Sequence, residues 1–259
     1  MILGAQFFTF REKCQTLEGL EESMKRVSKM GIRAIQLSGV CKYDPEWAAE
    51  KAAKYGLEIV LTHNPYDNVV EKTDEIIDFH KKLNCKNIGI GTMPGWEITE
   101  EKYEKFVKEM TVASKKIHDN GLQFMYHNHN IEYQVSNGKR YIDRLVEDFP
   151  SELLNLTYDT YWGQHAGADP AKAIRDYKGH IKVVHFKDMI AYVSKEEPGK
   201  VEHRIAAIGE GNMNYDSIIQ ACFDTGVEYG LIELDDCYGE DPFDAMRRSY
   251  EFLKKYNIK

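Results

Sequence analysis

Four short apolar runs in the second half of the chain end on side chains that commonly bind divalent metals. Three of these side chains are Asp159, His185 and Glu233, each placed directly after its run. The fourth ligand is expected from the first of the four runs, where Glu132 is the first choice and His127 the alternative. Such an oxygen-rich set with an imidazole favours Mn, Mg or Co, and Zn is possible. Taken singly, each residue also fits a helix cap or a salt bridge at the rim of a barrel.

Side chains at the ends of separate runs converge on one point when the runs are parallel strands that close into a ring. The chain of 259 residues has the length of one such barrel. Eight strands are predicted at roughly 3–9, 33–37, 57–62, 87–91, 122–127, 154–158, 181–185 and 229–233. We therefore expect an α/β fold, a single-domain (β/α)8 TIM barrel over residues 1–259. A doubly wound open sheet is the alternative, and ligands spread over many strand ends argue against it.

Helical patterns fill most gaps between the predicted strands, most clearly at 18–30, 68–83, 99–119 and 242–255. Glycines at the ends of several of these patterns suit the left-handed position after a helix. Asp-Pro pairs begin the helices near residues 44, 169 and 241, since Asp caps free amides and Pro fits the first turn. Residues 189–214 are expected to form an irregular loop at the barrel mouth, where long loops carry function.

Further side chains near the strand ends suggest roles in proton transfer and in substrate binding. The catalytic candidates are Glu233, His127, His129 and Lys187. The two histidines are two residues apart and share a face if the strand continues through them. Lys187 shares a face with His185 and is suited to stabilising an enolate. The candidates for substrate binding are Gln6, His63, Trp162 and Arg204, with Trp96 as a further apolar wall.

Composition excludes several classes of function. The net charge is −8 and no basic stripe is visible, so nucleic acid is not an expected partner. No apolar run approaches the ~18 residues of a membrane span, and the N-terminus lacks a signal-peptide pattern. Five cysteines without Cys-x-x-Cys spacing are typical of reduced thiols. We expect a cytoplasmic protein that acts on a small-molecule sugar, and a homo-oligomer is compatible with the sequence.

Three stretches of the sequence carry family motifs. Residues 126–133 read Tyr-His-Asn-His-Asn-Ile-Glu-Tyr, residues 184–188 read Val-His-Phe-Lys-Asp, and residues 3–9 read Leu-Gly-Ala-Gln-Phe-Phe-Thr. With these motifs the chain resembles, over nearly its whole length, the xylose-isomerase-like TIM barrel superfamily. That superfamily includes sugar phosphate isomerases/epimerases and AP endonuclease 2-like proteins.

The resemblance implies metal ligands at Asp159, His185 and Glu233 and a contact of Arg204 with substrate oxygens. Ketose 3-epimerases of this superfamily carry a glutamate ligand where this chain has His127. Either Glu132 returns to the metal, or His127 binds it directly. A histidine would then replace one of the two glutamate bases of those epimerases.

The implied function is a metal-dependent isomerase or epimerase of a sugar or keto-sugar, working through α-proton abstraction and a metal-stabilised enediolate. The alternative is a lyase of the same superfamily, either an inosose-type dehydratase or an enzyme that cleaves keto-glycosides. A nuclease for abasic DNA is disfavoured, because it requires a histidine where Trp162 stands. A non-catalytic sugar-binding protein is the remaining hypothesis.

Overall fold

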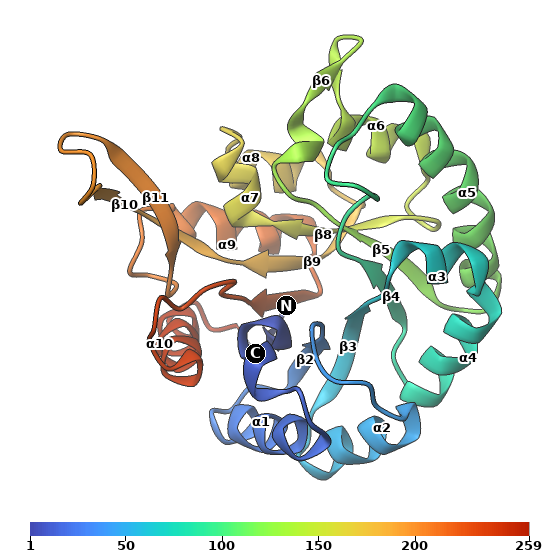
Figure 1. Cartoon of the computed structure of the whole chain (residues 1–259), viewed down its shortest axis with the longest axis horizontal. Coiled ribbons are helices and arrows are strands. Elements are labelled where there is room, and N and C mark those ends of the chain that lie inside the picture. The colour runs from blue at the N-terminus through green and yellow to red at the C-terminus, as the bar shows by residue number, and fades with distance from the viewer. Residues whose placement is uncertain (259) are drawn as a thin grey trace.

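The chain folds into a closed barrel of eight parallel strands surrounded by helices, which confirms the predicted fold class. The computed structural model describes residues 1–258. The first strand pairs with the last, so the two ends of the chain close the ring (Figure 1). Around the barrel the order is β1, β12, β9, β8, β5, β4, β3, β2. The strands are β1 (Ile2–Gln6), β2 (Ala34–Leu37), β3 (Glu58–His63), β4 (Asn87–Ile90), β5 (Gln123–His127), β8 (Asn155–Asp159), β9 (Ile181–Phe186) and β12 (Tyr229–Ile232).

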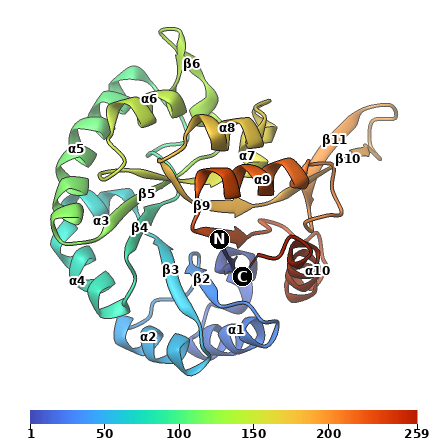
Figure 2. The same ribbon diagram turned by 180° about the vertical axis from the view of Figure 1, so that it is seen from behind.

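The helices lie outside the strands, as both views of the ribbon show (Figures 1 and 2). Asp44, Asp169 and Asp241 cap helices that begin with Pro, as predicted. Gly226 follows α9 with a positive φ of 79°, the backbone conformation that ends a helix at little cost in glycine. The helices are α1 (Leu17–Lys29), α2 (Pro45–Lys54), α3 (Tyr66–Glu71), α4 (Thr73–Leu83), α5 (Glu100–Asp119), α6 (Tyr141–Asp148), α7 (Thr160–His165), α8 (Pro170–Asp176), α9 (Tyr215–Thr225) and α10 (Pro242–Lys254).

The interior of the barrel is apolar below the mouth. Met125, Val183 and Leu231 are completely buried and belong to one small apolar cluster. Because side chains alternate along a strand, the residues two positions further on face the same interior. Those residues are His127, His185 and Glu233, so the apolar layer lies directly beneath three of the candidate ligands.

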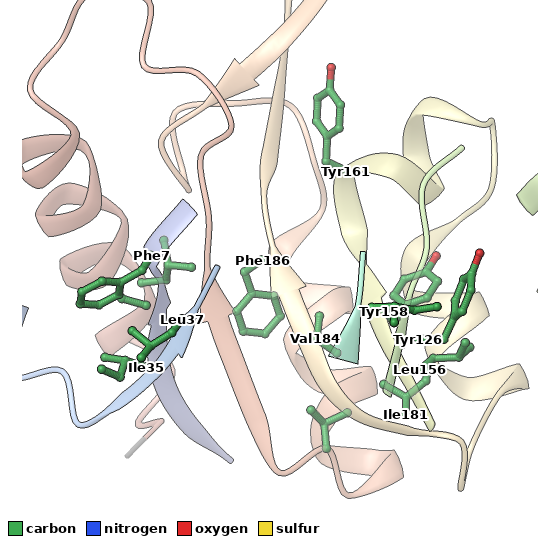
Figure 3. Packing of buried hydrophobic residues seen from close by; sticks show 14 of the residues in the cluster. Phe7, Ile35, Leu37, Tyr126, Leu156, Tyr158, Tyr161, Ile181, Val184 and Phe186 are labelled. Atoms are coloured by element: carbon green, nitrogen blue, oxygen red, sulfur yellow. The ribbon is translucent and has the colours of Figure 1, made fainter. Parts of the chain in front are cut away.

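The larger apolar core lies between the strands and the helices. Figure 3 shows Tyr126 and Tyr158 side by side on neighbouring strands, with Leu156 and Ile181 below them. The ring of Tyr126 packs edge-on against Phe106 of α5, at 5.6 Å between centroids. Outward residues thus anchor the strands to the helices, and inward residues of the same strands are free to form the site.

Two elements differ from the sequence prediction by more than a single residue at an end. The first strand ends at Gln6 instead of residue 9, because the Gln6 side chain accepts a hydrogen bond from the Phe8 amide and begins a 3-10 helix, η1 (Phe7–Lys13). The helix predicted at 68–83 is divided into α3 and α4 at Lys72, whose backbone leaves the helical region. There the Thr73 hydroxyl donates to the Val69 carbonyl and replaces a backbone partner.

The prediction of an irregular loop at 189–214 was wrong for residues 189–206. Residues 188–206 form an antiparallel hairpin of β10 (Asp188–Val193) and β11 (Val201–Ala206), which projects from the barrel (Figures 1 and 2). Its base is fixed by the buried Asp188 carboxylate, which accepts hydrogen bonds from the backbone amides of Met189, Gly209, Gly211 and Met213. Hydrogen bonds between the two strands of the hairpin pair its backbone amides and carbonyls, which would lack partners in an irregular loop of this length.

Smaller elements complete the chain. A short 3-10 helix, η2 (Ile131–Tyr133), follows β5, and β6 (Val135–Ser136) pairs with β7 (Lys139–Arg140). All five cysteines are free thiols. None of the helices in residues 1–258 is both long and apolar enough to cross a membrane.

Candidate metal centre at the barrel mouth

Four side chains at the carboxyl ends of four strands meet at one point. They are His127 of β5, Asp159 of β8, His185 of β9 and Glu233 directly after β12, each at most 4% exposed. One donor atom from each lies within 4.8 Å of the other three. The set has two imidazoles and two carboxylates, and all four groups can bind a divalent metal.

The spacing of the donor atoms fits a small coordination sphere. Asp159 Oδ2 lies 3.1 Å from His127 Nε2 and 3.9 Å from His185 Nδ1, which is 2.8 Å from Glu233 Oε2. Tetrahedral ligands at about 2.1 Å from a metal are about 3.4 Å apart. His185 Nδ1 and Glu233 Oε2 are buried and yet form no hydrogen bond of good geometry. Two buried acceptors at this distance require a shared cation or proton, so the residues fit a metal.

Hydrogen bonds to the other ring nitrogens orient both imidazoles. His127 Nδ1 lies 3.1 Å from the Gly91 carbonyl oxygen, and His185 Nε2 lies 2.7 Å from Gln36 Oε1. Both oxygens are acceptors, so each of these nitrogens carries the proton. His185 Nδ1 therefore presents a lone pair to the cluster, as a metal ligand must. His127 Nε2 instead forms a hydrogen bond to Asp159 Oδ2 at 3.1 Å, and a metal would replace the proton of that bond.

The two oxygens of Asp159 have different partners. Oδ1 accepts from the Trp162 amide at 2.9 Å and so caps α7, while Oδ2 faces the cluster. The Asp159 amide donates to the side chain of the buried Asn128, at 3.0 Å. Thr160 accepts from the Lys187 amide and donates to backbone carbonyls of β9 and of Lys187. These contacts lock β8 against its neighbours at the height of the site.

Lys187 places an ammonium group against the cluster. Its Nζ lies 3.0 Å from Asp159 Oδ2, 3.0 Å from Glu233 Oε2 and 2.8 Å from Asp235 Oδ1, and the residue is 1% exposed. Burial alone would lower the pKa of Lys187, but the three carboxylates outweigh it and raise the pKa well above its ordinary value. Burial alone would raise the pKa of Asp159, but the same ammonium outweighs it and lowers the pKa of that carboxyl. Both groups are therefore charged.

The histidines near the site divide into two kinds. Burial lowers the pKa of His185 well below its usual value, and burial together with His127 lowers that of His129 to about 2. Burial also acts to lower the pKa of His127, but there the Asp159 carboxylate outweighs it and the pKa is raised. His129 is therefore a neutral ring at physiological pH, and it holds a proton poorly as a base.

The structure corrects the expectation that Glu132 is the fourth ligand, because His127 occupies that place in the cluster. The Glu132 carboxylate is completely buried in η2 and accepts from the Tyr126 hydroxyl at 2.6 Å and from the His129 amide at 2.8 Å. Burial raises its pKa. The turn of η2 places this carboxylate beside the hydroxyl of Tyr126, whose ring belongs to the larger apolar core.

Several predicted substrate contacts surround the cluster. The ring of His129 lies between those of Trp96 and Trp162, at centroid distances of 4.7 and 5.3 Å. His63 lies 5.4 Å from His127 between ring centroids. Buried polar atoms without a partner gather here: Gln6 Nε2, Gln36 Nε2, His63 Nε2, His129 Nδ1 and Trp162 Nε1. Such atoms are costly unless water or a ligand binds them.

Arg204 lies further out than predicted. It is exposed on β11, and its guanidinium stacks on the rings of Tyr192 and Tyr238 at 5.4 and 4.9 Å. Sequence reasoning gave no role to Asp235, Asn128 or Thr160, which support the site. Their positions next to candidate ligands at strand ends were the available signal.

Comparison with known proteins agrees with this architecture. Residues 24–256 match the family model of the xylose isomerase-like TIM barrel. An inosose dehydratase of Geobacillus kaustophilus (strain HTA426) is 21% identical over 192 residues, which are 65% of this chain and 62% of that protein. Inosose dehydratase 2 of a Bacillus cereus strain is 30% identical over 176 residues, which are 62% of this chain and 58% of that protein. The chain thus matches less than two thirds of either relative's length.

Solved structures share the fold over nearly the whole chain. A sugar phosphate isomerase/epimerase of Parabacteroides distasonis ATCC 8503 superimposes with a TM-score of 0.80 at 21% identity, covering 98% of this chain and 97% of that chain. The probable 3-DHS dehydratase AsbF of Bacillus anthracis superimposes with a TM-score of 0.75 at 15% identity, covering 98% and 99%.

Proposed function

The chain belongs to the xylose isomerase-like TIM barrel family, and on this premise we propose that it is a metal-dependent enzyme that removes the α-proton of a keto-sugar. The observation that carries the proposal is the convergence of His127, Asp159, His185 and Glu233 within 4.8 Å, with the Lys187 ammonium beside them. A salt bridge with a purely structural role would not require two imidazole rings, each oriented by its own hydrogen bond, beside a pair of buried carboxylates.

The charge of the site supports a divalent ion. With His127 and His185 neutral, as metal ligands must be, Asp159, Glu233 and Asp235 bring three negative charges against the single positive charge of Lys187, which leaves a deficit of two. A divalent ion held by the four clustered residues would supply the charge that polarises a carbonyl group and acidifies the neighbouring C–H bond. Since the set holds two imidazoles, Mn, Co or Zn fit it better than Mg.

The remaining chemistry belongs to the side chains. Glu233 is the basic group in the mouth that takes the proton, and the positive charge of Lys187, held in place by its carboxylate partners, stabilises the oxygen that becomes negative. An isomerase needs one base: Glu233 returns the proton to the former carbonyl carbon, while the proton of the α-hydroxyl group passes to the former carbonyl oxygen. An epimerase needs a second group that donates a proton to the other face of the same carbon. The proposed activity is an isomerase or an epimerase.

A lyase is the second candidate, and it has the same first step. It is supported by the similarity to inosose dehydratases at 21% and 30% identity. In this reaction the electron pair left by the proton expels a β-hydroxyl group, and Glu233 passes its proton to that group, which leaves as water. One base is sufficient here as well.

The lining of the mouth supports an uncharged, polyhydroxylated substrate. Lys187 is engaged by three carboxylates and is not free to pair with a phosphate. The unpartnered Gln6, His63 and Trp162 nitrogens offer hydrogen bonds to hydroxyl oxygens. The indole rings of Trp96 and Trp162 add an apolar wall for a sugar ring.

Metal content tests the proposal first. We expect elemental analysis to find one divalent ion per chain, lost in Asp159→Asn and retained in the matched control Asp235→Asn, which changes a carboxylate outside the ligand set. No ion in the native protein, even after growth with Mn or Co, would refute the proposal.

The reaction class is tested with the metal-loaded protein in deuterated water and a panel of keto-sugars and keto-polyols. An isomerase moves the carbonyl group and keeps the mass apart from exchanged deuterium. A lyase gives a product lighter by one water or by an aglycone. Absence of solvent exchange with every substrate would contradict proton abstraction.

A further inference from the structure

Two loops form one side of the mouth, and a single buried carboxylate joins them. The β4 loop (residues 91–98) carries Trp96, and the β5 loop (residues 128–133) carries His129. Glu132 Oε1 accepts from the Tyr126 hydroxyl at 2.6 Å and from the Thr92 hydroxyl of the β4 loop at 3.3 Å. Its Oε2 accepts from the His129 amide of the β5 loop at 2.8 Å.

Tyr126 extends this connection. Its hydroxyl donates to Glu132 and also accepts from the Met93 amide of the β4 loop at 3.1 Å. The residue is completely buried, so both bonds of its hydroxyl replace water that it has lost. The pair of Tyr126 and Glu132 thus binds three groups in the β4 and β5 loops, and its two members bind each other.

The connection decides where the aromatic rings lie. The His129 ring contacts Trp96 at 4.7 Å and the ligand His127 at 4.7 Å between centroids. Trp96 itself is 63% exposed and has a positive φ of 52°, a strained conformation for a residue with a side chain. Little packing holds such a ring, so the hydrogen bonds at residues 92 and 93 are what keep its loop in place.

We infer that Glu132 is a positioning residue, which fixes His129 and Trp96 beside the metal site and does not bind the metal. The inference rests on the proposed function for the meaning of the site. It extends that function by giving the buried glutamate a separate task, holding the wall that a substrate ring would contact.

The experiment combines a local spectroscopic probe with metal binding by the full chain. The protein is labelled with 5-fluorotryptophan, and its three 19F resonances are assigned with single Trp→Phe variants. Glu132→Ala should shift or broaden the Trp96 resonance and leave that of Trp47 on α2 unchanged. Mn2+ affinity, measured by calorimetry, should stay within about threefold of the native value.

Conservative variants separate positioning from general damage. Glu132→Gln should restore most of the native Trp96 signal, because its amide still accepts from the His129 amide and donates to the Tyr126 oxygen. Tyr126→Phe should disturb Trp96 in the same way as Glu132→Ala, and it serves if the alanine variant does not fold.

Two outcomes would overturn the inference. A loss of Mn2+ affinity of tenfold or more in Glu132→Gln would make the glutamate a ligand. An unchanged Trp96 resonance in both Glu132→Ala and Tyr126→Phe would show that the carboxylate does not fix the position of Trp96. If Asp159→Asn still binds Mn2+, the proposed function fails, while the 19F result remains valid on its own.

Discussion

The hydrogen bond between Gln36 and His185 leads to a quantitative prediction for metal affinity. Gln36 Oε1 lies 2.7 Å from His185 Nε2 and keeps the proton on that nitrogen, leaving Nδ1 free for the metal. In Gln36→Met the Nε2–H group loses its acceptor. The ring proton then moves to Nδ1, where Glu233 Oε2 is 2.8 Å away and accepts it.

Metal binding must reverse this change of tautomer. It then leaves a buried N–H group without a partner, at a cost of about 1–3 kcal/mol. The cost corresponds to a loss of roughly 10–100-fold in affinity, the range typical for removing a partner of a metal-bound histidine. Calorimetric titration of the metal-free protein with Mn2+ measures it directly.

Gln6→Met is the matched control. Gln6 is paired with Gln36 in register, is equally buried, and bonds to the Phe8 amide instead of a histidine. Its replacement should change Mn2+ affinity by less than about threefold. Equal losses in both variants, or no loss in Gln36→Met, would refute the account of the tautomer.

Two further predictions concern stability. Gly209→Ala should lower the melting temperature, measured by scanning calorimetry, by well over the ~2–8 °C expected of the control variant Gly167→Ala. Both glycines have a positive φ, but of the two only position 209 would bring the new methyl group into the ring of Phe252. Similar losses in both variants would show that the ring moves aside freely. Burial lowers the pKa of His80 to about 4, so between pH 6.5 and 4 the unfolded chain binds the proton more readily. The contribution of His80 is therefore complete above pH 6.5 and falls by roughly 1.4 kcal/mol per pH unit below it. Urea unfolding at pH 7 and pH 5 should show a smaller loss of stability in His80→Gln than in the native protein, and equal losses would contradict the assignment.

The barrel and the positions of the clustered residues were predictable because their signals are local. A strand is a short apolar run, and the residue that ends it lies at the mouth if the strands are parallel. Asp159, His185 and Glu233 follow from this rule, and so does His127 as the last residue of the strand predicted at 122–127. The hairpin at 188–206 also had a local signal that was not used, since two segments with aromatic and β-branched residues flank Pro198-Gly199.

The choice between Glu132 and His127 depended on information that the sequence does not carry locally. Glu132 lies five residues beyond the end of β5, and the turn of η2 decides its direction. The contact of Gln36 with His185 joins residues 149 positions apart, and only closure of the barrel brings them together. Chemical type identified the candidates, but the three-dimensional path of the loops decided that His127 joins the cluster and that Glu132 lies outside it.

The divided use of Asp159 restricts which residues this position accepts. One oxygen ends helix α7 and the other faces the metal site. Glutamate would carry the same charge on a longer side chain. If its carboxylate moved to cap α7, it would lose its contact with the cluster, and the reverse also holds. Asparagine keeps the helix cap but offers the cluster no charge. Redesign of the site for another metal is therefore more readily begun at His127, whose ring anchors no helix, than at Asp159.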